Sequence, residues 1–334
     1  MKYVKRFLIF LLIAVVISGF AFHENEYTQT EFMLDTVITV TAYGNNAKSA
    51  TKAAFKRIKE IEDKFNAYDE SSEVSRINKS EKTQNVDSEV YNLIKKSLEF
   101  SYATEGAFDI TLKPLSDLWR IGTENERVPS ESEIEAAILR CGSSFVSLSD
   151  DDMSVTFLKE DMSFDLGAVA KGYAAEEAVR VLKENGVKNA YLDLGGNVAV
   201  IGKKPLGLFE NIFNLKKERD FVIGIQHPTK SRGEIIDTVT GNDNYIVTSG
   251  AYERCFYENG IRYHHILDSE TGYPAESEFD SVTVISKDGT AADMISTALF
   301  VMGKDGLELI SGDLYEEIIF VKDEKIEHVK SVQN

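Results

Sequence analysis

The chain has 334 residues, of which 43% are hydrophobic and 28% charged, and its net charge is −18 at pH 7. These values describe one large folded domain or two closely packed ones, and they exclude a disordered chain. With 55 acidic residues against 37 basic ones, nucleic acid is not an expected partner, because binding it requires basic side chains that neutralise phosphates. Cys141 and Cys255 could form one disulfide, but two buried free thiols are the favoured interpretation.

Residues 1–26 have the pattern of a targeting segment. Residues 1–6 are basic and residues 7–22 are apolar throughout. As a helix the apolar run would span about 24 Å, a little under the roughly 30 Å hydrocarbon core of a bilayer. This fits either a secretory signal peptide or a short membrane anchor with its basic end inside. Both interpretations export residues 27–334, so we expect a protein that is secreted or held at the extracytoplasmic face of the cell membrane.

From residue 27 onwards, strand and helix patterns alternate. Apolar and polar residues alternate over residues 27–44, which predicts a strand. Apolar residues recur at helical spacing over residues 45–64 and again over 86–104, which predicts two amphipathic helices. Residues 65–78 between them are mostly polar but include Tyr68 and two aliphatic residues, so an ordered loop is expected there.

Residues 106–122 contain the only Trp of the chain. Small residues beside Phe108 and Asp109 suit a loop that contacts a ligand, but a segment packed in the core is an equally good interpretation. Residues 130–133 (Ser-Glu-Ser-Glu) have the spacing of a capping box, which predicts a helix that ends near Gly142.

A strand, a turn of small residues and a helix follow one another in the middle of the chain. The predicted strand includes Phe164, residues 167–168 form the turn, and the helix begins near Lys171 and ends at Gly186. The free N–H groups of a helix N-terminus can hold an anion such as phosphate. Asp165 and Lys171 are the charged groups that such a ligand would meet. The alternative is that the small residues serve only to pack the helix on the strand.

The remaining chain is predicted to consist mainly of short strands. Residues 203–220 show no period and predict a surface excursion, whereas residues 290–302 predict a helix. Antiparallel strands with segregated helices indicate an α+β fold, mainly antiparallel sheets with flanking helices, in one domain over residues 27–334 that could contain two intimate subdomains. The strands are expected over residues 145–148, 154–158, 189–194, 198–201, 221–226, 234–239, 245–249, 252–257, 262–267, 280–286, 318–321 and 325–329.

Two further stretches carry side chains suited to chemistry. His264 and His265 are adjacent on a predicted strand, so they face opposite sides, and one can face a site while the other packs or is solvated. Asp293 and Thr297 are spaced i and i+4, which stacks them on one face of a helix. A carboxylate and a hydroxyl so placed can hold a hard cation such as Mg²⁺, or can simply bond each other inside the core. Residues 248–254 add hydroxyl groups before a Gly break.

In combination and order, these stretches resemble the ApbE-type FAD:protein FMN transferases, a family of exported flavin-handling enzymes. The resemblance covers roughly residues 31–303 and rests on eight short motifs. They are Phe-Met-x-Asp-Thr at 32–36, Tyr68 with residues 72–78, Gly-Ala-Phe-Asp at 106–109 with Pro114 and Trp119, Asp-Leu-Gly-Ala-Val-Ala-Lys-Gly at 165–172, Leu-Gly-Gly-Asn at 194–197, Thr-Ser-Gly at 248–250, His-His-Ile at 264–266 with Thr-Gly at 271–272, and Ala-Asp-x-x-x-Thr at 292–297.

The resemblance implies a Mg²⁺-dependent enzyme that cleaves FAD, transfers FMN through its phosphate to a Thr or Ser hydroxyl of an acceptor protein, and releases AMP. It implies that His265 assists deprotonation of the acceptor hydroxyl. It also implies that the metal ligands are the backbone carbonyl of Ala168 and the side chains of Asp293 and Thr297. The positions that match FAD contacts in the family are Met33, Tyr68, Ala107, Phe108, Asp109, Asp165, Lys171 and Ile266.

Three positions depart from the family pattern. Asp35 stands where Gly is common, Ser269 replaces a usual Pro, and Lys171 occupies a position that is Glu in some members. Two other functions remain open from the sequence alone. A FAD pyrophosphatase would use water in place of the acceptor hydroxyl. A non-catalytic flavin-binding protein would need neither a metal nor a base.

Overall fold

The computed structural model of the chain describes residues 25–80, 83–206 and 218–331. The predicted targeting segment lies outside the described residues except for its last two, and so do residues 207–217 of the predicted surface excursion. In the described part of the chain, no helix is long and apolar enough to cross a membrane.

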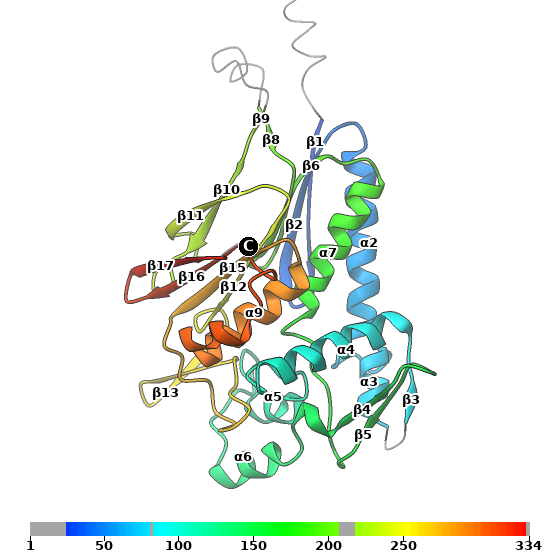
Figure 1. Cartoon of the computed structure of the whole chain (residues 1–334), viewed down its shortest axis with the longest axis vertical. Coiled ribbons are helices and arrows are strands. Elements are labelled where there is room, and N and C mark those ends of the chain that lie inside the picture. The colour runs from blue at the N-terminus through cyan, green and yellow to red at the C-terminus, as the bar shows by residue number, and fades with distance from the viewer. Residues whose placement is uncertain (1–24, 81–82, 207–217, 332–334) are drawn as a thin grey trace, which may run out of the picture.

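One antiparallel sheet organises the molecule (Figure 1). Among the described residues it has eight strands, in the order β1-β2-β6-β7-β12-β15-β16-β17, and all neighbours are antiparallel. The sheet and its helices confirm the α+β prediction. The strands are β1 (Glu26–Met33), β2 (Thr36–Tyr43), β6 (Asn189–Leu194), β7 (Asn197–Ile201), β12 (Tyr245–Gly250), β15 (Ser281–Ser286), β16 (Glu317–Lys322) and β17 (Lys325–Lys330).

The single strand predicted over residues 27–44 is wrong, because it is a hairpin of β1 and β2. Leu34 and Asp35 form the turn with φ of 51° and 55°, and Met33 pairs with Thr36. Such turns favour Asn-Gly or Asp-Gly, so Leu34 and Asp35 do not indicate a turn. The alternation of apolar and polar residues also continues across them, which predicted one strand. The left-handed backbone at Asp35 also explains physically why Gly suits this position.

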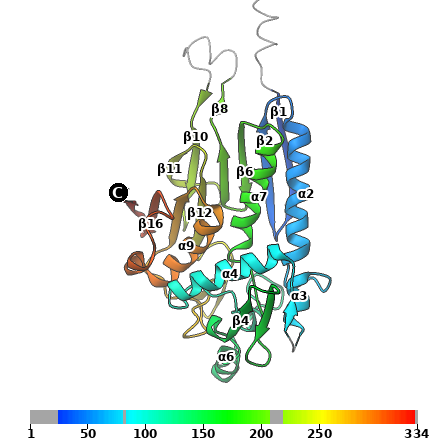
Figure 2. The ribbon, with the colours of Figure 1, turned by 45° about the vertical axis from the view of Figure 1, so that its right-hand side comes forward.

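Three helices cover one face of the sheet, which we call the inner face. They are α2 (Ala47–Phe65), α7 (Ala170–Glu184) and α9 (Gly289–Met302), and α7 packs against both of the others. Figures 1 and 2 show α2 and α7 side by side along the strands, with α9 crossing further along the sheet. Gly172 of α7 lies so close to α9 that a Cβ there would be 2.3 Å from the carbonyl oxygen of Gly289.

The opposite, outer face is partly covered by a separate hairpin of β10 (Phe221–Gln226) and β11 (Ile235–Gly241). Phe221 and Ile223 pack there on Val198 and other outward-facing residues of the main sheet, which forms a second core. The predicted strands of this region are confirmed. The short pair β8 (Lys204–Pro205) and β9 (Glu218–Arg219) flanks residues 207–217.

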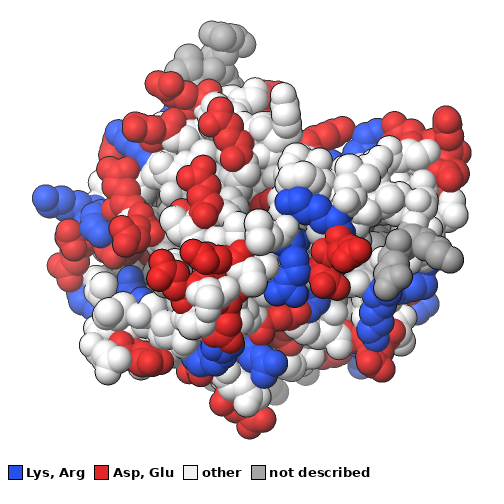
Figure 3. Space-filling model, turned by 90° about the horizontal axis from the view of Figure 1, so that it is seen from below, with Lys and Arg blue, Asp and Glu red and all other residues white. Residues whose placement is uncertain are grey.

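Beyond one end of the sheet lies a region of short elements, seen below the sheet in Figures 1 and 2. A third core there contains the fully buried Trp119. Figure 3 views this end and shows acidic side chains dispersed over it with basic ones between them. The elements are α3 (Glu73–Asn78), β3 (Gln84–Asn85), α4 (Ser88–Ala103), α5 (Lys113–Trp119), α6 (Glu131–Ile138), η1 (Ser143–Phe145), β4 (Val146–Ser149), β5 (Ser154–Phe157), β13 (Cys255–Glu258) and β14 (Ile261–His264). The short helix η2 (Lys304–Leu309) follows α9 and packs against it.

Several local predictions for this region need correction. The expected loop over residues 65–78 contains α3, which Ser72 caps by accepting a hydrogen bond from the N–H of Ser75. Residues 106–122 contain α5 and place Trp119 in the core, so the packing interpretation holds for that part. The strand predicted to include Phe164 is wrong, because residues 162–166 belong to no strand. Cys141 is buried, but Cys255 is only half-buried, and both are free thiols.

Candidate active site

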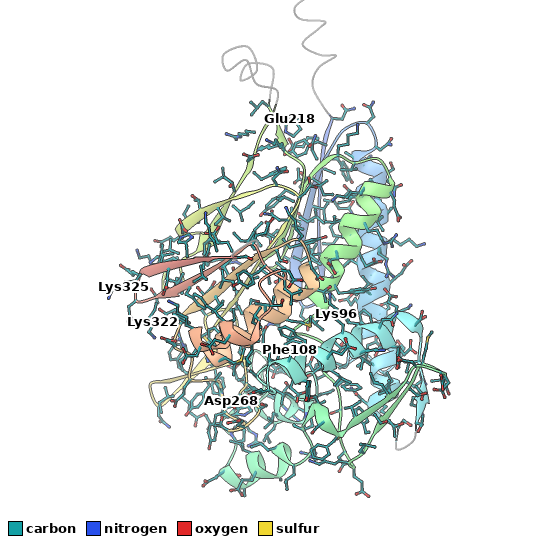
Figure 4. All side chains as sticks on the ribbon, viewed as in Figure 1. Lys96, Phe108, Glu218, Asp268, Lys322 and Lys325 are labelled. Carbon is teal, nitrogen blue, oxygen red and sulfur yellow. The ribbon has the colours of Figure 1, made fainter. Side chains whose placement is uncertain are left out.

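Side chains from distant segments meet near the start of α7. Lys171 lies in the first turn of α7, Asp293 lies in α9, and His265 follows β14 directly. Lys171 Nζ is 4.0 Å from Asp293 Oδ1, and the ammonium of Lys171 is close enough to His265 to affect its pKa. The structure thus brings together three of the residues that the sequence singled out separately. Figure 4 shows Phe108, from a fourth segment, beneath α9.

Asp293 is 3% exposed and has its two carboxylate oxygens in different environments. Oδ2 accepts a hydrogen bond of 2.8 Å from the backbone N–H of Gly172, which fixes the orientation of the carboxylate. Oδ1 faces Lys171 Nζ, which lies 3.4 Å from the carbonyl oxygen of Gly167. The ammonium group of Lys171 therefore lies between Asp293 and a carbonyl of the turn that contains Ala168.

This arrangement fits a hard cation held through oxygen. Asp293 supplies a carboxylate oxygen, and Thr297 supplies a hydroxyl one helical turn later, 3.3 Å from the hydroxyl of Ser249. Ala168 lies in the turn before α7 and is half-buried. Within the described residues no three side chains of His, Cys, Asp or Glu form a metal-binding group, so the candidate ligands here are one carboxylate, one hydroxyl and one backbone carbonyl.

The two adjacent histidines face different surroundings, as expected, but they do not share a strand, because β14 ends at His264 and His265 lies in the bend that follows. His264 is 6% exposed, its Nε2 lies 3.1 Å from the carbonyl oxygen of Ala275, and its Nδ1 accepts from the N–H of Ile266. These bonds hold a neutral imidazole, and burial lowers the pKa of His264 to about 4. Its ring also packs edge-on against Phe300. His264 is therefore the structural member of the pair.

His265 is exposed, and its Nδ1 lies 3.3 Å from the carbonyl oxygen of Arg254. Solvent reaches part of the ring, yet the surrounding protein and the cations of Lys171 and Arg254 lower the pKa of His265 below its ordinary 6.5. The imidazole is therefore neutral at pH 7. Because Nδ1–H donates to the Arg254 carbonyl, Nε2 keeps its lone pair and can accept a proton.

Tyr68 and Asp165 line a second part of the site. The ring of Tyr68 is 60% exposed and lies under Lys113, whose Nζ is 4.1 Å from the ring centroid. Loss of hydration around the hydroxyl and the nearby carboxylates of Asp165 and Asp117 raise the pKa of Tyr68. Burial likewise raises the pKa of Asp165, although its Oδ1 accepts from the N–H of Gly167. An exposed aromatic face beside charged groups suits a planar ring system.

Residues 107–109 form a turn between α4 and α5. Phe108 is 1% exposed and packs against Phe100, so it can meet a ligand only through its backbone. Asp109 accepts hydrogen bonds from the N–H groups of Thr111 and Ser143, and burial raises its pKa. Asp109 also lines a cavity of about 600 Å³, which neither His265 nor Asp293 lines.

Besides Phe108, two of the residues predicted to contact FAD are largely buried. Met33, at the end of β1, is 8% exposed, and Ile266, just after the histidine pair, is 7% exposed. Arg254 is a site residue that sequence reasoning missed, although it ends a stretch that was singled out. Its Nη2 donates to the carbonyl oxygen of Asp35, which ties the β1–β2 turn to the segment that holds His265.

The fold is α+β, and the site combines a neutral imidazole, a lysine at a helix N-terminus and oxygen atoms of a type that can hold a cation. These groups suit an enzyme that transfers groups through phosphate. More particularly, the chain belongs to the ApbE family, because the model of that family matches residues 34–320.

Named relatives agree with this assignment. The FAD:protein FMN transferase of Klebsiella pneumoniae (strain 342) is 33% identical over 279 residues, 83% of each chain. That of Treponema pallidum (strain Nichols) is 31% identical over 308 residues, 89% of this chain and 84% of the relative. The crystal structure of the ApbE protein from Thermotoga maritima matches with a TM-score of 0.80 and 36% identity, covering 91% of this chain and 96% of that one.

Proposed function

We infer that this chain is a FAD:protein FMN transferase. It cleaves FAD, joins the FMN part through its phosphate to a Thr or Ser hydroxyl of an acceptor protein, and releases AMP. Membership of the ApbE family and the named relatives support the transferase activity. The observation that carries the chemistry is the neutral His265, held by the Arg254 carbonyl and close to Lys171, which in turn faces Asp293.

The reaction requires a base, because a hydroxyl is a poor nucleophile until its proton is removed. His265 Nε2 takes the proton of the acceptor hydroxyl as its oxygen bonds to the phosphorus of the FMN half. The bond from that phosphorus to the bridging oxygen breaks, and AMP leaves with that oxygen. The imidazole then returns the proton to solvent.

The pyrophosphate brings negative charge into a protein of net charge −18, so positive groups must be local. Lys171, in the first turn of α7, binds and orients the phosphates. Two of the first three N–H groups of that helix are already bonded, Ala170 to the carbonyl of Leu166 and Gly172 to Asp293. Asp293, Thr297 and the carbonyl of Ala168 would hold Mg²⁺, which when bound polarises the phosphoryl oxygens and stabilises the leaving group. Tyr68 would stack on a ring of FAD, with Met33, Asp165, Ile266 and residues 107–109 around it.

We also propose that the catalytic domain is exported from the cytoplasm. The basic start and apolar run of residues 1–22 support export of the catalytic domain, which would then act on exported acceptor proteins while secreted or membrane-held.

One assay tests the activity against its alternatives. The exported domain is incubated with FAD, Mg²⁺ and a candidate acceptor protein, and acceptor mass and free AMP are measured, with EDTA as the metal-free control. AMP together with an FMN adduct is expected. AMP and free FMN without an adduct would indicate a pyrophosphatase, and neither product would indicate a binding protein.

A further inference from the structure

Asn197 carries a buried hydrogen-bond donor that the mechanism above does not use. It ends the Leu-Gly-Gly-Asn motif at residues 194–197 and begins β7. Its side chain is 2% exposed, and its Nδ2 is buried without a hydrogen-bond partner. Buried polar atoms in proteins are nearly always bonded, so an unpaired amide at this depth requires an explanation.

The alternation of β7 shows which way Asn197 faces. Ala199 and Ile201, two and four residues further on, belong to the inner core, whereas Val198 and Val200 belong to the outer core. Side chains of a strand alternate between faces, so Asn197 lies on the inner face. α7 and α9 cover that face, and α7 packs against β7.

The neighbours of Asn197 on this face belong to the candidate active site. Asn197 pairs with Val247 of β12, so Ser249, two residues along β12, is its diagonal neighbour on the same face. The Ser249 hydroxyl is 3.3 Å from the hydroxyl of Thr297, one helical turn from Asp293. The free amide thus lies diagonally across from Ser249, whose hydroxyl contacts that of Thr297, a proposed metal ligand.

The turn before Asn197 has open space beside Gly196. Gly195 and Gly196 have φ of 65° and 97°, and Gly195 lies against Thr36. A Cβ built at Gly196 would meet nothing within 4 Å. The motif therefore combines a tight turn, packed at Gly195 and open at Gly196, with the inward-facing donor of Asn197.

We propose that the Asn197 side-chain amide donates a hydrogen bond to a phosphate oxygen of the flavin nucleotide. This inference rests on the proposed function and adds a positioning residue to it. A neutral donor can bind a phosphate oxygen without adding a charge to the site. When substrate binds, its phosphate would also supply the hydrogen-bond acceptor that Asn197 Nδ2 otherwise lacks.

The test compares Asn197→Ser and Asn197→Asp with the same changes at Asn244. Asn244 is also buried, but its Nδ2 donates to Glu316 within the fold and it lies beside the opposite end of β12. Each protein is titrated with FAD, FMN and riboflavin, with flavin fluorescence as the readout. The melting temperature of each flavin-free protein is also measured. FMN and FAD carry phosphate and riboflavin does not, so the three ligands identify the contact.

We expect Asn197→Ser to bind FAD and FMN about 10- to 100-fold more weakly than the wild type. Its affinity for riboflavin and its melting temperature without flavin should be unchanged. Asn197→Asp should weaken FAD and FMN further, because a carboxylate repels phosphate. The Asn244 variants should melt lower and keep wild-type flavin affinity.

Unchanged FAD and FMN affinity in Asn197→Ser would overturn the inference, and so would an equal loss for riboflavin. If Asn197→Asp does not fold, the Ser variant alone decides. A failure of the proposed function is distinct from these results, since it would appear in the transfer assay as wild-type protein that forms no FMN adduct, whereas these titrations measure flavin binding alone.

Discussion

At the scale of single residues, His265 is defined by its hydrogen bond and its charged neighbours. Its Nδ1 faces the Arg254 carbonyl, which leaves Nε2 free as a base. His265→Ala should lower kcat by about 10²- to 10⁴-fold and leave FAD affinity nearly unchanged, because general-base catalysis typically contributes that much. Single-turnover kinetics with flavin titrations would measure both. A wild-type kcat would remove His265 from the mechanism.

The lowered pKa of His265 predicts the pH dependence of the reaction. A base is active when neutral, so a pKa below 6.5 keeps His265 competent in mild acid. The rate at limiting acceptor should stay level from pH 8 to below 6.5 and fall only at lower pH. A pH–rate profile with a half-maximal point above 6.5 would contradict this assignment.

Asp293 combines a structural bond with a proposed ligand role, and two substitutions separate them. Asp293→Ala should abolish turnover with the fold intact, but it also leaves the buried N–H of Gly172 without an acceptor, at a cost of about 1–3 kcal/mol. Asp293→Asn keeps an oxygen for Gly172 and removes the charge. It should melt close to wild type and still show no detectable transfer. Normal turnover would exclude Asp293 from the ligand set.

At the scale of elements, the contact between α7 and α9 positions the site. A Cβ at Gly172 would lie 2.3 Å from Gly289 O and 2.7 Å from Asp293 Cβ. Gly172→Ala should therefore separate the helices, lower the free energy of unfolding by about 1–3 kcal/mol and reduce turnover. Gly312→Ala is the control, since its nearest atom would be 3.6 Å away. Denaturant unfolding and the transfer assay measure both effects, and equal stability of the two variants would refute the tight contact.

At the scale of the whole molecule, a partly buried charge network joins three helices. Arg57 of α2 bonds Glu89 of α4 and Glu177 of α7, and Glu89 also accepts from Lys64 and Tyr173. Burial alone would raise the pKa of Glu89, but the bonds from Lys64, Arg57 and Tyr173 lower it to about 2. Glu89 thus stabilises the fold fully above pH 4.5, and this contribution is lost as pH falls towards 2.

Glu89→Gln should lower the free energy of unfolding at pH 7 by about 2 kcal/mol, between the effects typical of exposed and fully buried ion pairs. Its stability should also fall less than that of the wild type between pH 4.5 and 2. Urea unfolding at several pH values would show this. Glu184→Gln, in an exposed pair with Arg180, should change stability little at any pH. A wild-type acid slope in Glu89→Gln would contradict the prediction.

Regular periodicity made much of the fold predictable. The helices near residues 47–65, 88–103, 170–184 and 289–302 were expected from apolar spacing, and the capping box of Ser130 and Glu133 is confirmed. The β1–β2 turn was missed because Leu34 and Asp35 carry no turn signature. α3 and α5 were missed because a helix of one or two turns is too short to show a period.

The sequence by itself determined the α+β class, the family motifs and the side chains available for chemistry, because these depend on local spacing and residue type. Only the tertiary structure decided which of those side chains meet. Lys171 and Asp293 approach because Gly172 lets α7 contact α9, and the pKa of His265 is lowered because the surrounding protein removes water from it and Lys171 and Arg254 lie nearby. Distances between segments far apart in the chain arise from packing, and no local pattern encodes them.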